Sequence, residues 1–143
     1  MFRTILAVIA GFFLWLIVWF GNEALLSAVW PKFDAQQQAF QDALDKGGQF
    51  QPETIFLLTH VLSGAIAALL SGFVSSIIAN ENKRAPLIVG LLLTTLGVLK
   101  AVLSWQLVPM WYHVVFTGML LPLTLIGGGL RSRAQVDLKK SSL

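Results

Sequence analysis

The sequence contains no cysteine, which excludes disulfides, thiolate metal sites and cysteine nucleophiles. Charged residues are also few, at 12% of 143 residues, and no catalytic or cofactor-binding motif occurs among them. Hydrophobic residues, in contrast, make up 56% of the chain, and its mean hydropathy is +0.75. This composition is too apolar for an ordinary soluble domain and indicates a protein embedded in a membrane.

Four apolar stretches are long enough to cross a bilayer as helices, which takes about 20 residues because the hydrocarbon core is about 30 Å thick. They cover residues 5–29, 54–80, 86–105 and 110–130. The first stretch is longer than the core of a signal peptide, and no small-x-small cleavage site follows it promptly, so we expect a mature helix. The sequence therefore predicts one all-α domain over residues 1–143, an integral membrane bundle of four transmembrane helices.

The basic residues fall mainly on one side of the predicted spans. Seven lie there: Arg3, Lys83, Arg84, Arg131, Arg133, Lys139 and Lys140. On the other side, the loop 31–53 contains Lys32 and Lys46 together with four acidic residues. The positive-inside rule therefore places both termini, and a tail over 131–143, in the cytoplasm. This asymmetry explains the net charge of +3, so we expect no nucleic-acid partner.

The extracytoplasmic loop 31–53 carries a helical pattern of its own. Three apolar residues repeat at helical spacing: Phe33, Phe40 and Leu44. Asp34 and Gln37 resemble a capping box, and the glycines at 47–48 end the pattern. We predict a short amphipathic helix over the outer mouth of the bundle, which either covers helix ends or forms a lid or docking surface.

Aromatic residues mark two levels of the predicted bundle. Four lie at the outer boundary, where one edge of a ring can stay hydrated: Trp30, Trp105, Trp111 and Tyr112. Trp15 and Trp19 lie deeper, on one face of the first span. We interpret that pair as packing or lipid contacts, with a stacking wall for a flat ligand as the alternative.

The second span has a face of small residues headed by a histidine. Its members recur every four residues: His60, Gly64, Ala68, Gly72 and Ser76. A second row widens the face: Ser63, Ala67, Ser71 and Ser75. Helices in lipid associate through close contact between small residues, so this face predicts a helix interface, with His60 directed toward another helix.

The third span repeats this pattern with Gly90, Gly97 and Ser104, and Lys100 belongs to the same face. In the fourth span, one face holds three polar residues: His113, Thr117 and Thr124. Pro122 predicts a kink. We expect the glycines at 127–129 to end this helix; a phosphate site on their backbone amides is the less favoured interpretation, because the P-loop residue order is missing.

Each span carries one ionisable residue that we place in its outer third: Glu23, His60, Lys100 or His113. Because a charge in hydrocarbon costs at least about 2.5–3.5 kcal/mol, Lys100 needs a partner or an exit to the interface. We predict an ion pair with Glu23, supported by Asn22 and Ser104. Its role is a structural lock between helices, an anion or head-group pocket on Lys100, or proton or substrate coupling by Glu23.

The two histidines also allow a haem with bis-imidazole ligation, or a metal held by His60, His113 and Glu23. Both alternatives require the second and fourth helices to face each other with both rings directed inward. Lys100 nearby would oppose a cation. We therefore expect no cofactor.

From the second span onward, the order of features resembles a broad group of small four-helix bacterial membrane proteins. The matching elements are Gly64–Ala79, Lys83 with Arg84, Gly90 with Gly97, Pro109 with Trp111, and Pro122 followed by Gly127 and Gly128. The similarity covers roughly the last ninety residues and consists of packing motifs. It implies a protein of the bacterial cytoplasmic (inner) membrane and supplies no catalytic residue.

We therefore expect a non-enzymatic multi-pass membrane protein, an accessory or assembly subunit whose outer polar pocket holds a lipid or other amphiphile. Its partners are the lipid bilayer and either another membrane protein or a second copy of the chain. The alternatives are a small proton-coupled transporter that works as an oligomer, and a b-type haem protein. The transporter alternative differs from small multidrug exporters in one respect. Their carboxylate lies near the middle of the membrane, whereas we place Glu23 closer to its outer edge.

Overall fold

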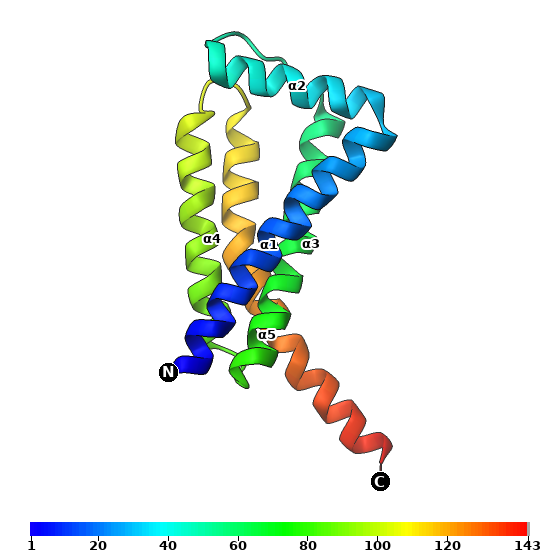
Figure 1. The fold of residues 1–143 in the computed structure, drawn as a ribbon, viewed down its shortest axis with the longest axis vertical. Helices are drawn as coiled ribbons and strands as arrows, with labels where there is room; N and C mark the ends of the chain where they lie inside the picture. Colours follow the sequence, from blue (N-terminus) through cyan, green and yellow to red (C-terminus); the bar gives the residue numbers. More distant parts are fainter. Residues whose placement is uncertain (143) are drawn as a thin grey trace.

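The computed structural model describes residues 1–142, which form helices and no strand. In chain order the helices are α1 (Phe2–Val29), α2 (Pro31–Lys46), α3 (Thr54–Ala79), α4 (Arg84–Leu103) and α5 (Met110–Ser141). Four of them, α1, α3, α4 and α5, are long and apolar enough to cross a membrane, which agrees with the predicted spans. Helix α2 lies across one end of these four, and both chain termini lie toward the opposite end (Figure 1).

Helix α3 is the centre of the bundle and packs against α1, α4 and α5. Its predicted small-residue face is buried along its whole length: His60, Ser63, Gly64, Ala67, Ala68, Ser71, Gly72, Ser75 and Ser76. Ser71 also donates a hydrogen bond to the carbonyl oxygen of Gly11 in α1, at 2.7 Å. The prediction that this face forms a helix interface is confirmed.

The glycine face of α4 is also buried and lies against α5. A Cβ added to Gly90 would stand 2.7 Å from Leu121 Cδ1, and one added to Gly97 would stand 3.1 Å from Leu120 Cδ1. Ser104, on the same face, is buried as well. The small residues therefore let α4 approach α5 closely, as predicted.

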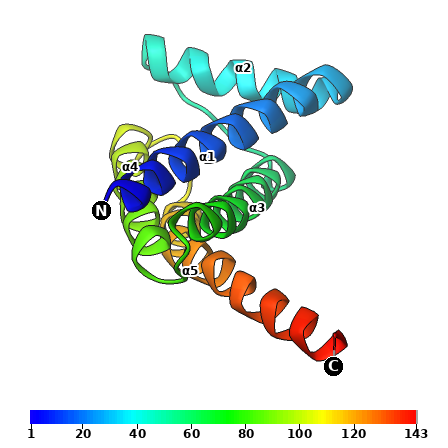
Figure 2. The ribbon, with the colours of Figure 1, turned by 60° about the horizontal axis from the view of Figure 1, so that its bottom comes forward.

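The expectation that α5 ends at its glycine run is wrong. The helix continues to Ser141, so most of the segment expected to be a tail is helical. A Cβ on Gly127 would stand 2.1 Å from the carbonyl oxygen of Leu69, and one on Gly128 would stand 2.5 Å from Pro86 Cγ. These glycines keep helical backbone angles and allow close contact with α3 and α4 instead of stopping the helix. Pro122 lies inside α5, and the orange and red half of the helix leans away from the bundle (Figures 1 and 2).

Helix α2 forms as predicted, but it begins differently. It starts at Pro31, whose fixed φ suits the first helical position, so the expected capping box is wrong. Asp34 instead accepts a hydrogen bond from the Gln38 amide at 2.9 Å. Gly47 ends the helix with a positive φ of 65°, which confirms the predicted stop.

The four aromatic residues of the predicted boundary differ in exposure, and Trp30 is half-buried and stacks on Phe33. Trp105 and Trp111 are 53% and 41% exposed, as expected for side chains at an interface. Tyr112 is buried and stacks on Phe116, with ring centroids 5.5 Å apart, so its predicted interfacial position is wrong. It lies one helical turn from Phe116 on the face of α5 that is directed into the bundle.

Candidate ligand cavity

A cavity of about 270 Å³ lies between α2 and the four long helices. At this end of the molecule, α1 and α3 lie near the start of α2, and the end of α4 with the loop after it lies near the end of α2 (Figure 1). Its aromatic lining consists of Trp15, Trp19, Phe20, Phe40 and Phe116. Its polar and ionisable lining consists of Glu23, Gln37, Gln41, His60 and Lys100. All five helices contribute, and three of the four predicted site residues line the same space.

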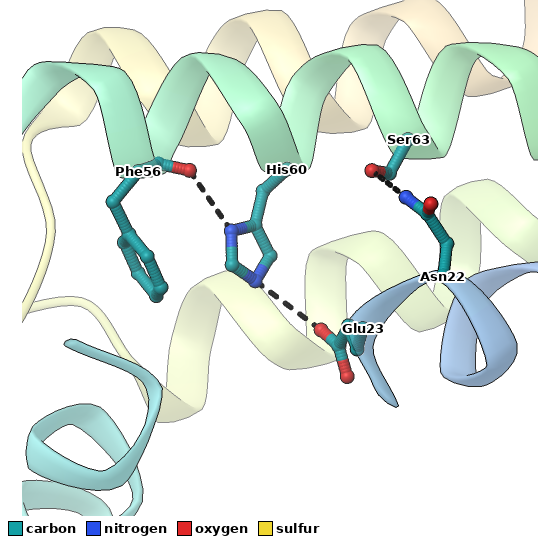
Figure 3. A network of polar contacts seen from close by, with 5 residues as sticks. All are labelled: Asn22, Glu23, Phe56, His60 and Ser63. Atoms are coloured by element: carbon teal, nitrogen blue, oxygen red, sulfur yellow. Dashed lines mark hydrogen bonds and ion pairs between the residues drawn. The ribbon is translucent and has the colours of Figure 1, made fainter. Parts of the chain in front are cut away.

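Glu23 of α1 and His60 of α3 are in direct contact in this cavity (Figure 3). His60 Nε2 lies 3.2 Å from a Glu23 carboxylate oxygen, and His60 Nδ1 lies 3.0 Å from the carbonyl oxygen of Phe56. The imidazole is 5% exposed and packs against Phe56 and Phe33, at centroid distances of 4.4 Å and 5.4 Å. Helix α2 thus contributes Phe33 to the fixed orientation of the histidine.

The Glu23–His60 contact can hold one proton. A carbonyl oxygen only accepts, so His60 Nδ1 carries a hydrogen and donates it to Phe56. A neutral ring then has a lone pair on Nε2, and an ionised carboxylate also offers only lone pairs. The contact between them is therefore a hydrogen bond only when a proton lies on one of the two groups. The pair is neutral with this proton and carries one negative charge without it.

Asn22 and Ser104 have roles different from those predicted. Asn22 donates a hydrogen bond to the Ser63 hydroxyl and so joins α1 to α3 beside the Glu23–His60 pair (Figure 3). Ser104 donates to the carbonyl oxygen of Lys100 at 2.8 Å, near the end of its own helix. Thr117 packs close to Gly97, and its buried hydroxyl has no hydrogen-bond partner within residues 1–142. None of the three supports an ion pair.

The predicted ion pair between Glu23 and Lys100 is wrong, because Glu23 contacts His60 instead. The Lys100 ammonium lies over two aromatic rings, 4.8 Å from the centroid of Trp19 and 5.1 Å from that of Phe116. Such faces attract a cation, although they supply no hydrogen-bond acceptor with a lone pair. Among the described residues, the ammonium makes no ion pair and no side-chain hydrogen bond. Lys100 and Glu23 nevertheless line the same cavity.

His113 lies apart from this group. Its ring stacks on Trp105 with centroids 5.6 Å apart and planes 7° apart, and its Nε2 is buried without a partner in residues 1–142. Both ring nitrogens of His60 are already engaged, so a haem or metal on His60 would have to displace Glu23 or Phe56. The described residues contain no cluster of three or more His, Asp or Glu side chains that could hold a metal.

A second cavity, of about 390 Å³, adjoins the first and lies between α2 and α4. The two share Phe40, Leu44, Leu96 and Lys100. The second adds the buried Ser104 together with Leu99 and Leu103, which are 54% and 69% exposed on the surface of α4. A ligand can therefore reach Lys100 along an apolar path that begins on the outside of the bundle.

The sequence indicates only some of the residues that form this site. Trp19 and Phe116 hold the ammonium, and Gln37 and Gln41 line the cavity from α2. The one-face spacing of Trp15 and Trp19 was the available signal, since the structure stacks these rings 5.5 Å apart in the cavity wall. No sequence pattern indicated that the glutamines of α2 face the bundle.

No family model, curated protein or solved structure matches this chain. The fold itself defines the class: an all-helical chain with four helices suited to crossing a membrane and a fifth lying across one end.

Proposed function

We propose that the protein binds a lipid or other amphiphile in this cavity and acts as a non-enzymatic accessory or assembly subunit of a membrane-protein complex. The observation that carries the proposal is a space with ionisable groups inside and an apolar path to the surface of α4. An amphiphile has the matching division into a polar head and an apolar chain. Its head would lie near Lys100 and Glu23, and its chain along Leu96, Leu99 and Leu103.

The size of the cavity supports a small head group. Its volume of about 270 Å³ is near the lower end of the roughly 300–1,000 Å³ usual for small-molecule sites. The second cavity, of about 390 Å³, gives room for part of an acyl chain. A single-chain lipid, or one chain of a larger lipid, suits this combination.

We further propose that the end with both termini faces the cytoplasm of a bacterial inner membrane, which puts the cavity in the outer leaflet. The seven basic residues outside the spans on the terminal side support this orientation. Helix α2 then lies at the extracytoplasmic surface, with its polar face toward water.

Lipid analysis of the purified protein tests the amphiphile proposal. Leu96→Trp places a bulky ring where the two cavities join, whereas Leu92→Trp makes the same change one turn away, at an exposed position outside both. Native mass spectrometry after mild-detergent extraction should detect a bound lipid on the wild type and Leu92→Trp and lose it on Leu96→Trp. Equal lipid content in all three proteins contradicts a ligand in this cavity.

Native purification tests the accessory role. The protein extracted from its own host in a mild detergent should bring down a reproducible larger complex. A solitary monomer under these conditions contradicts this part of the proposal and leaves the lipid site standing.

A small proton-coupled transporter working as an oligomer is the second candidate, and the Glu23–His60 pair favours it because it can gain and lose a proton beside the cavity. In proteoliposomes with an imposed pH gradient, adding lysophosphatidylglycerol or lysophosphatidylethanolamine should then speed proton entry, followed with a trapped pH dye. Glu23→Gln should abolish the effect. Identical rates for the wild type, the variant and empty liposomes eliminate transport of these lipids.

A further inference from the structure

We infer that the ligand of the cavity carries an anionic head group, which binds on Lys100, and that its binding is linked to the uptake of one proton by the Glu23–His60 pair. This inference rests on the proposed amphiphile site and adds the chemical class of the ligand and a co-bound proton.

Two groups that line the cavity, Lys100 and Trp15, have hydrogen-bond donors without an acceptor among residues 1–142. An ammonium carries three donors, but Lys100 faces only the rings of Trp19 and Phe116, with no acceptor bound among the described residues. Trp15 also lines the cavity, and its indole N–H is buried without a partner in residues 1–142. A phosphate or carboxylate offers acceptors of the kind that both groups lack. Lys100 is also the one lysine or arginine in the cavity lining.

Few charged groups surround the Glu23–His60 pair in the cavity. The groups that line the same cavity from the other helices include Gln37 and Gln41 of α2, Lys100 of α4, and Phe116 and Leu120 of α5. Tyr112 and His113 of α5 are titratable groups at the same end of the bundle, and neither lines the cavity. Lys100 is therefore the one lysine or arginine that lines the cavity together with the pair.

The net charge of the cavity depends on whether the Glu23–His60 pair holds its proton. With its proton, the Glu23–His60 pair is neutral, and Lys100 leaves the cavity with a net charge of +1. Without the proton, the carboxylate cancels Lys100 and the net charge is zero. An anion therefore binds better when the pair is protonated, and by reciprocity a bound anion draws a proton onto the pair. Binding should tighten as the pH falls, with the uptake of at most one proton.

Two lipids with the same single acyl chain test this inference in the intact protein. Lysophosphatidylglycerol has a net negative charge and lysophosphatidylcholine has none, and neither phosphodiester titrates between about pH 6 and about pH 8.5. Calorimetry on the protein in phosphatidylcholine nanodiscs, corrected with empty nanodiscs, gives both affinities. We expect lysophosphatidylglycerol to bind at least about tenfold more tightly at about pH 6, with the preference shrinking toward about pH 8.5. Repeating the titration in buffers of different ionisation enthalpy counts the protons taken up. Glycerophosphoglycerol, which has the charge without the chain, should bind more weakly and so distinguishes a lipid from a free phosphate.

Three substitutions separate the parts of the site. Lys100→Met should remove the preference for the anionic lipid, Lys100→Arg should keep it, and the exposed control Lys32→Met should have no effect. Glu23→Gln removes the negative charge while an amide can still donate to His60 Nε2. This variant should therefore keep the preference seen at low pH and show a weaker pH dependence and less proton uptake, because only His60 can then take a proton.

The outcomes distinguish the inference from the function on which it rests. If both lipids bind the wild type equally at every pH, the anionic head group is overturned while amphiphile binding stands. If the anionic lipid is preferred without proton uptake, the link to Glu23–His60 is overturned. If neither lipid binds and Leu96→Trp behaves as the wild type, the proposed function itself fails. The wild-type comparison decides the first two points even when a variant does not fold.

Discussion

Gly72 of α3 lies so close to Thr124 of α5 that a Cβ on Gly72 would stand 1.9 Å from the Thr124 carbonyl oxygen. Gly127 of α5 makes a similar approach to the backbone of Leu69. The two helices thus touch backbone to backbone toward the end with the termini, while the bundle opens into a cavity at the end covered by α2. The tight contacts hold one end of the bundle while the other end stays apart around the cavity.

Gly72→Ala should destabilise the protein by about 1–3 kcal/mol or more, because the added methyl group would force α3 and α5 apart. The matched control is Gly118→Ala in α5, an exposed position where a Cβ would meet nothing within 4 Å. That variant should be neutral or gain up to about 1 kcal/mol from helix propensity. Unfolding in mixed micelles, followed by far-UV circular dichroism against the fraction of denaturing detergent, measures both. Equal stability of the two variants would contradict the close contact.

The hydrogen bond between Asn22 and Ser63 should contribute a coupling energy of about 0.6 kcal/mol, the average measured for such bonds between membrane helices. A double-mutant cycle with Asn22→Ala, Ser63→Ala and the double variant isolates this energy from the effect of each side chain elsewhere. The same unfolding assay applies. Additive single effects would show that α1 and α3 are not joined at this point.

Arg131→Met should cost about 1 kcal/mol, because Arg131 of α5 closes the end of α3. Its guanidinium donates to the carbonyl oxygen of Ser76 at 2.7 Å and to the side chain of Asn80, the left-handed residue that ends α3. Arg133→Met makes the same change at an exposed position two residues on and should shift stability by less than about 0.5 kcal/mol. Backbone amides near the end of α3 should also exchange faster with deuterium in Arg131→Met only. Unchanged exchange would contradict this capping role.

Helix periods and small-residue spacing predicted most of the fold. The faces of α3 and α4 were recognisable because close helix contact in lipid requires small residues at fixed spacing. The glycines of α5 do not stop the helix. A glycine after an apolar run indicates either a helix stop or a close contact, and only the position of the neighbouring helix decides between the two. Leu69 and Pro86 supply that neighbour here.

The sequence brings together three ionisable residues that line the cavity, but it does not give their pairing. Depth along each helix brings Glu23, His60 and Lys100 to one level. It gives no information on how one helix is rotated against another, so charge alone favours Lys100 as the partner of Glu23. Burial of His60 beside Glu23, with Lys100 over Trp19, depends on how α1 is rotated against α3 and α4. His113 has the same depth and faces Trp105 instead.

Single cysteines should reveal the orientation of the bundle, and the absence of native cysteine makes this labelling clean. Gly48→Cys lies beyond α2, where a Cβ would meet nothing within 4 Å, and Ser142→Cys lies at the opposite end, just after α5. If both termini face the cytoplasm, a membrane-impermeant maleimide added to intact spheroplasts should label Gly48→Cys and leave Ser142→Cys unlabelled. Both should be labelled after the membrane is opened, which controls for accessibility. The reverse pattern in intact spheroplasts would place the cavity in the inner leaflet, beside the cytoplasm.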